Sequence, residues 1–89
     1  MQESYLEITF RHGKALAAYY YLPRRASDVS VRTEQVEASM LVDYARGGRP
    51  IGIEITSPNQ ASLAALNRVL TSLGLERARR EDFAPLRAA

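Results

Sequence analysis

The segment from Met40 to Thr56 constrains the fold more than any other part of the chain. Its sequence, MLVDYARGGRPIGIEIT, alternates apolar and polar residues on both sides of the pair Gly47-Gly48. Two alternating runs around two glycines are typical of a β-hairpin, because glycine accepts the positive φ angles of a tight type I′ turn. We therefore predict a hairpin with strands at about 40–45 and 51–56, in which Gly47 and Gly48 form the turn.

The same alternation predicts the register of this hairpin. With the two glycines as the loop, the expected cross-strand pairs are Arg46–Arg49, Tyr44–Ile51, Asp43–Gly52, Val42–Ile53, Leu41–Glu54 and Met40–Ile55. Apolar residues then face apolar residues. A slip of one residue would place the two apolar sets on opposite faces of the sheet, so the sequence itself specifies the register.

Three further alternating segments precede the hairpin. Residues 5–10 (YLEITF) predict a first strand, His12-Gly13-Lys14 a turn, and residues 15–22 (ALAAYYYL) a second strand that ends at Pro23. The second strand is apolar on both faces, which favours a central position. Residues 29–37 predict a third strand, with a bulge or strand end near residues 34–35. No helical segment separates the strands, so the sheet is expected to be mostly antiparallel.

One helix is expected after the sheet, at about 59–73. Residues 57–59 offer a cap and a first-turn proline, and an apolar stripe follows at Leu63, Leu66, Val69 or Leu70, and Leu73. Gly74 is placed to end the helix in a left-handed conformation. The tail, 75–89, forms either a short second helix up to Pro85 or an irregular segment. The prediction is a single α+β domain over 1–89, with a five-stranded, mostly antiparallel sheet (about 5–56), one covering helix and a short tail.

Composition narrows the class of protein. The chain has 89 residues, a net charge of +2 and no cysteine. Its length fits one domain, and the lack of cysteine excludes disulfides and thiolate metal sites and fits a reducing compartment. No run approaches the roughly 18 apolar residues of a membrane span, and no basic segment followed by an apolar core marks a secretory signal. We expect a cytoplasmic protein.

Several of these segments together resemble a known bacterial family. They are the aromatic strand at 18–22, Thr33, the triplet at 42–44, a glycine turn, and the segment at 52–55. The pattern resembles the domain of unknown function 2283, a set of small proteins and short domains, over about residues 5–57. The turn at 45–48 departs from the acidic or Asn-rich turn usual in the family. The resemblance implies no established activity and no catalytic residues. Some members resemble the antitoxin half of toxin–antitoxin pairs, being small and encoded beside a small basic toxin-like protein.

Asp43 and Glu54 are the candidates for chemistry. In the expected register they are diagonal neighbours on one face, roughly 7–8 Å apart at the backbone, a distance compatible with a shared divalent cation or an acid–base pair. The competing interpretation is two acids that are solvated or paired with arginine. We favour it, because no histidine or third carboxylate accompanies them in the sequence. His12, the only histidine, is expected to be exposed in its turn.

The tyrosines of the second strand allow a nucleic-acid reading, because aromatic side chains on a sheet can stack bases. Glu7 and Glu54 are expected to share that sheet, so packing in a core or interface is the better account. The arginines of the tail are interspersed with acids, which favours a solvated, salt-bridged segment over a phosphate site. Nucleic-acid binding is therefore the weaker alternative.

The expected dimensions favour a protein–protein interaction module without a cofactor. A helix over 60–73 is roughly 21 Å long, whereas five strands make a sheet roughly 24 Å wide. If Leu6, Leu16, Val42 and Ile53 face the helix, the opposite face stays uncovered. The expected partner is a second copy or a small protein, and the expected interaction surface is Tyr19, Tyr21, Leu41, Phe83 and Leu86, with Ala17 beside it. A tail that covers this face is the competing explanation, and a small metal-dependent hydrolase with Asp43 and Glu54 is the alternative function.

Overall fold

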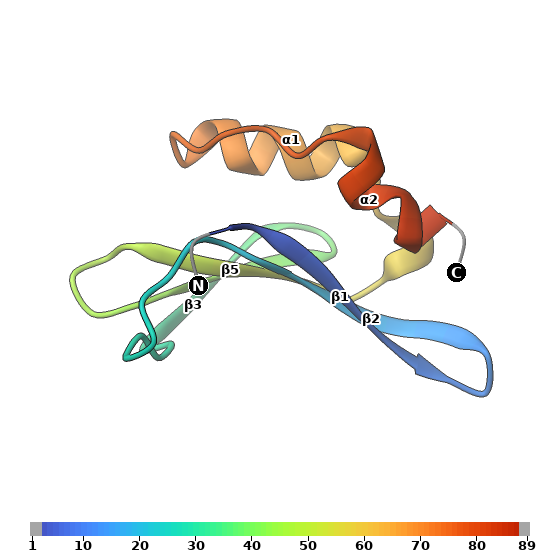
Figure 1. The fold of residues 1–89 in the computed structure, drawn as a ribbon, viewed down its shortest axis with the longest axis horizontal. Helices are drawn as coiled ribbons and strands as arrows, with labels where there is room; N and C mark the ends of the chain where they lie inside the picture. The colour runs from blue at the N-terminus through green and yellow to red at the C-terminus, as the bar shows by residue number, and fades with distance from the viewer. Residues whose placement is uncertain (1–2, 88–89) are drawn as a thin grey trace.

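The computed structural model describes residues 3–87. Its elements, in chain order, are β1 (Tyr5–Arg11), β2 (Lys14–Tyr21), β3 (Arg32–Glu37), β4 (Met40–Tyr44), β5 (Pro50–Ile55), the 3₁₀ helix η1 (Pro58–Gln60), α1 (Leu63–Ser72) and α2 (Arg80–Arg87). The strands form one antiparallel sheet in the order β1-β2-β5-β4-β3. Both helices lie on one side of it (Figure 1). The predicted α+β class and five-stranded sheet are confirmed.

The sheet consists of two local units joined in the middle. Strands β1 and β2 form a hairpin whose turn residues, His12 and Gly13, both have positive φ angles (52° and 77°), as a tight two-residue turn requires. Strands β3, β4 and β5 form a meander. The connection from β2 crosses the end of the sheet to β3 at the far edge, and β2 pairs with β5 from Ala18–Ile55 to Tyr21–Gly52. Strand β2 is therefore internal, whereas the middle strand is β5.

The predicted register of the β4–β5 hairpin is confirmed for four pairs, from Met40–Ile55 to Asp43–Gly52. It is wrong beyond them, because Tyr44 pairs with Pro50 instead of Ile51. The turn is also longer than predicted, since the amide of Ala45 donates to the carbonyl of Arg49 (2.8 Å). Gly47 and Gly48 have positive φ angles of 91° and 88°, but Arg46 does not. The predicted two-residue type I′ turn is therefore wrong.

The predicted helix at 59–73 is divided in two. Ser57 makes no side-chain cap, and the chain forms the short helix η1 before a break. Helix α1 begins after Ser62, whose hydroxyl accepts a hydrogen bond from the amide of Ala65 (3.0 Å). Its end is as predicted. Gly74 has a φ of 74°, and the amide of Leu75 donates to the carbonyl of Leu70 (2.9 Å), which is the Schellman arrangement.

The tail forms the second helix, α2, and this helix continues past Pro85 to Arg87 instead of stopping at the proline. Phe83 and Leu86 lie three residues apart on one side of α2 and are buried, with 3% and 6% of their surface exposed. This burial on the helix side of the sheet fixes α2 although Pro85 removes one backbone donor. The tail therefore completes the core under the helices and leaves the other side of the sheet uncovered (Figure 1).

The core lies between the sheet and the helices. On the sheet side it includes Ala18, Tyr20, Leu22, Met40, Val42, Tyr44, Ile53 and Ile55, and on the side of the helices Ala61, Leu66, Val69, Leu70, Ala78, Phe83 and Leu86. Val42 and Ile53 thus face the helices as predicted, and Leu6 packs against this core. Leu16 does not, since it is 54% exposed near the end of the β1–β2 hairpin.

Candidate functional site

The face of the sheet that points away from the helices is the candidate site, and we call it the open face. Its residues alternate along the strands with those of the core, and no element within residues 3–87 lies over it (Figure 1). They are partly or fully exposed, except for the small buried Gly52. The open face consists of Tyr5, Glu7, Tyr19, Tyr21, Thr33, Leu41, Asp43, Gly52 and Glu54.

Three tyrosines form a continuous row on this face. The rings of Tyr5 and Tyr21 are stacked, with centroids 4.5 Å apart, and Tyr19 meets Tyr21 edge-on at 4.7 Å. The Tyr21 hydroxyl donates a hydrogen bond to Glu7 (3.0 Å), which raises the pKa of Tyr21. Ring contacts and hydrogen bonds hold these side chains in place, so a partner would meet an ordered aromatic surface at little entropic cost.

Tyr19 extends from β2 across β5 to β4. Neighbouring strands are about 4.8 Å apart, so the ring must pass over the intervening strand to reach the carboxylate of Asp43, to which its hydroxyl donates (2.7 Å). The residue beneath is Gly52, and a Cβ atom there would overlap the Tyr19 ring. The glycine therefore makes this crossing possible. Sequence reasoning missed the role of Gly52, although a glycine inside a strand indicates close approach of another group.

Both carboxylate oxygens of Asp43 accept a hydrogen bond from a hydroxyl group. One carboxylate oxygen accepts from Tyr19, and the other accepts from the Thr33 hydroxyl (2.6 Å). Burial, and then the bond to Asp43, raise the pKa of Tyr19 well above its usual value. Tyr19 is therefore a neutral donor at physiological pH, and its phenol is not activated as a base or nucleophile.

Glu54 lies at the centre of the open face, between Tyr19 on β2 and Leu41 on β4. It forms no hydrogen bond or ion pair with any residue from 3 to 87. Asp43 and Glu54 share this face in the predicted register, but Asp43 is bound to the two hydroxyls. In the described part of the chain, no three His, Asp or Glu side chains are grouped to hold a metal ion. His12 is exposed in the turn at the far end of the β1–β2 hairpin.

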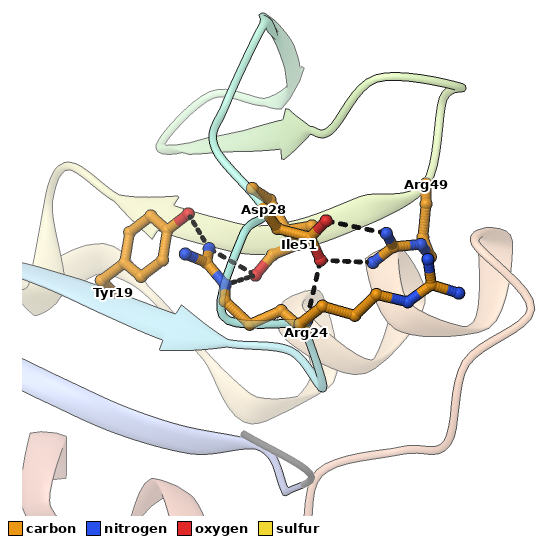
Figure 2. Close-up of polar contacts among 6 residues, drawn as sticks. Tyr19, Arg24, Asp28, Arg49 and Ile51 are labelled. Atoms are coloured by element: carbon orange, nitrogen blue, oxygen red, sulfur yellow. Dashed lines mark hydrogen bonds and ion pairs between the residues drawn. The ribbon is translucent and has the colours of Figure 1, made fainter.

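Arg24 lies against the tyrosine row, beside the hydroxyl of Tyr19 (Figure 2). Its guanidinium donates two hydrogen bonds to the carbonyl of Ile51 (2.8 and 3.3 Å) and lies 3.4 Å from the Tyr19 hydroxyl. It also lies 5.3 Å from the centroid of the Tyr21 ring. This cation–π contact shows that a guanidinium fits against the row.

The connection from β2 to β3 is held by a second arginine (Figure 2). Arg49 donates to both carboxylate oxygens of Asp28 (2.6 and 2.8 Å), and the amide of Arg25 donates to one of them (2.8 Å). The bond from Arg49 is the main reason that the pKa of Asp28 lies well below its usual value. The sequence alone does not reveal this ion pair, because contacts between distant residues leave no local pattern.

The predicted interaction surface is brought together only in part. Tyr19, Tyr21 and Leu41 lie on the open face. Phe83 and Leu86 do not, because α2 buries both in the core on the other side of the sheet. They are no longer part of the candidate surface.

Comparison with known proteins identifies no relative of this chain. No protein-family model, no curated protein and no solved structure matches it. The resemblance to the domain of unknown function 2283 therefore stays a prediction. No helix among the described residues is long and apolar enough to cross a membrane.

Proposed function

We propose that this protein is a protein–protein interaction module that binds through its open face, and that it is not an enzyme. The observation that supports this proposal is the row formed by Tyr5, Tyr21 and Tyr19 on a sheet face that the helices leave uncovered. Tyrosine offers a large apolar ring with a polar tip and is enriched at protein interfaces. Leu41 lies across Glu54 from Tyr19 and adds apolar surface to the same face.

The charges of the open face favour a protein over a nucleic acid. The strands present Glu7, Asp43 and Glu54 beside the tyrosines, and Arg24 is the cation that contacts the row. Bases stacked on these rings would bring their phosphates close to three carboxylates, whereas nucleic-acid binding depends on cations that replace the phosphate counterions. The acidic face therefore counts against nucleic acid as the ligand.

The hydrogen bonds of the open face favour binding over hydrolysis. Both oxygens of Asp43 already accept short bonds from hydroxyl groups, which leaves Glu54 as the one free carboxylate of the predicted pair. A hydrolytic site needs an activated nucleophile or base. Tyr19 is instead held neutral by burial and by its bond to Asp43.

An antitoxin-like role is one specific form of this proposal, since an antitoxin acts by binding a second protein. It comes from the resemblance alone, as does the bacterial origin. The cytoplasm is the compartment we propose, because a chain of 89 residues without cysteine suits a reducing environment.

The experiment is affinity capture from a lysate of the native cell. The bait is the tagged full chain, as wild type, as Tyr21→Asp or as Tyr5→Asp, and circular dichroism checks the fold of each variant. Val29→Asp is the control, since Val29 is 67% exposed in the β2–β3 connection and lies outside the open face. We expect wild type and control to capture the same protein and the tyrosine variants to lose it. Equal capture by folded tyrosine variants would contradict the proposal.

A further inference from the structure

The end of the β1–β2 hairpin projects beyond the rest of the molecule, and we call residues 9–17 the arm. Strand β2 pairs with β5 only from Ala18 onward, so the preceding residues of β2 pair with β1 alone. The arm extends past both helices at the blue end of the sheet (Figure 1). It is a two-stranded ribbon without a core of its own, an arrangement that is only marginally stable in water.

The arm exposes two large apolar side chains. Phe10 is 51% exposed and Leu16 is 54% exposed. Both lie at an irregularity in the hairpin, where the register shifts after Thr9 so that Phe10 pairs with Ala15 and Leu16 is skipped. Large exposed apolar side chains on a projecting segment indicate a contact surface.

The charges of the arm and of the open face are opposite. The arm contains Arg11, His12 and Lys14 and no acidic residue. The open face presents Glu7, Asp43 and Glu54, and Glu54 has no partner within residues 3–87. Potentials of opposite sign steer two surfaces together and fix their register.

The arm cannot satisfy this complementarity within one molecule. It continues β1 and β2, and the same two strands carry the tyrosine row of the open face. A continuous sheet cannot fold its own end back onto its own face. The complementary surfaces can therefore meet only between two molecules.

We infer that the arm of one copy binds the open face of a second copy. Lys14 or Arg11 then pairs with Glu54, and Phe10 contacts the tyrosine row. The contact of Arg24 with the Tyr21 ring shows that a guanidinium, such as that of Arg11, also fits against this row. Each copy carries one arm and one face, so a two-fold dimer makes the contact twice. Pairing of two open faces is disfavoured, because it opposes carboxylates to carboxylates. This inference rests on the proposed function, since it uses the open face as a binding surface.

The test uses two charge reversals in the full chain, one on each surface. Lys14→Glu makes the arm acidic, and Glu54→Lys makes the centre of the face basic. Each variant alone opposes like charges in both contacts, so its dimer should be weaker by about tenfold or more. In an equimolar mixture, the acidic arm of one variant meets the basic face of the other, and the reverse contact is the native one. We expect the mixture to recover the dimer.

Sedimentation velocity at micromolar concentration and low salt gives the readout. Glu76→Lys, an exposed site in the tail, is the control for a change of charge and should dimerise as wild type does. Recovery in the mixture cannot come from variants that fail to fold. The inference is overturned if wild type is a monomer of 9.9 kDa, or if the mixture stays monomeric while wild type dimerises. A monomer whose open face still captures another protein overturns it as well and leaves the proposed function standing.

Discussion

Replacing Gly52 by alanine should destabilise the protein only because Tyr19 lies above it. The new Cβ atom would overlap the Tyr19 ring, so either the sheet deforms locally or the ring leaves its place. The first outcome is overpacking, which costs about 1–3 kcal/mol. The second breaks the bond to the Asp43 carboxylate, and a hydrogen bond to a charged group contributes about 1.5–3 kcal/mol. The molecule takes the cheaper outcome, so we expect a loss of about 1–3 kcal/mol.

The sign should reverse when the ring is absent. Gly52 does not have a positive φ, so alanine fits its backbone. In a Tyr19→Ala background, Gly52→Ala should therefore stabilise the protein by roughly 0.4–1 kcal/mol, because it restricts the unfolded chain. The coupling free energy between the two sites should be about 1.5–4 kcal/mol, which is large enough to measure by a double-mutant cycle.

Urea unfolding of the four proteins in the cycle, followed by circular dichroism, gives the free energies of unfolding. Wild type, the two single variants and the double variant are compared at one pH and one protein concentration, because self-association also stabilises the folded state. If Gly52→Ala costs the same with and without the Tyr19 ring, the ring does not depend on Gly52 for its path across β5.

Three further predictions concern single sites. Arg49 lowers the pKa of Asp28 in the folded protein, so the ion pair stabilises the fold above the unfolded pKa of about 4, and this stability is lost as pH falls below that value. The free energy of unfolding, measured with urea from pH 7 to pH 3, should therefore fall less steeply for Asp28→Asn than for wild type. The raised pKa of Tyr19 has the opposite dependence on pH, because its contribution to stability is present below about pH 10 and is lost as pH rises through the higher folded pKa. The bond to Asp43 is one cause of this raised pKa, so an ultraviolet titration of Asp43→Asn should show one tyrosine that ionises at lower pH than in wild type. Asn67→Ala removes two bonds to the backbone of the α1–α2 connection (2.7 and 3.2 Å) and leaves buried groups unpaired, so thermal unfolding should show a loss of about 2–4 kcal/mol.

Local patterns predicted the parts of this fold that depend on neighbours in sequence. The register of the β4–β5 hairpin follows from alternation between Met40 and Ile55, and the end of α1 follows from Gly74. The helix cap expected at residues 57–59 lies instead at Ser62. Ser57 and Ser62 both precede helical segments, but only the Ser62 side chain accepts a hydrogen bond from a helix amide. Sequence could not distinguish them, since the choice depends on where the core holds the helix.

The open face was predictable only as a set of residues. Alternation placed Tyr19, Tyr21 and Leu41 on one side, and they stay exposed because both helices pack on the other side of the sheet (Figure 1). The burial of Phe83, a residue of α2, was not predictable, because Pro85 indicated the end of a helix and the contacts that compensate for it come from strands distant in the sequence. The path of Tyr19 over Gly52 was equally hidden, since it depends on the strand order.

The strand order has a consequence for folding. The β1–β2 hairpin and the β3–β4–β5 meander are both local and can form within microseconds, but the ladder from Ala18–Ile55 to Tyr21–Gly52 joins segments far apart in the sequence. Closing the intervening loop carries an entropic cost that the local hairpins avoid. We expect this ladder to form late. Tyr19 and Gly52 belong to it, so a folding chain acquires its hairpins before its open face, and a partner that recognises this face binds only molecules in which the two halves have already joined.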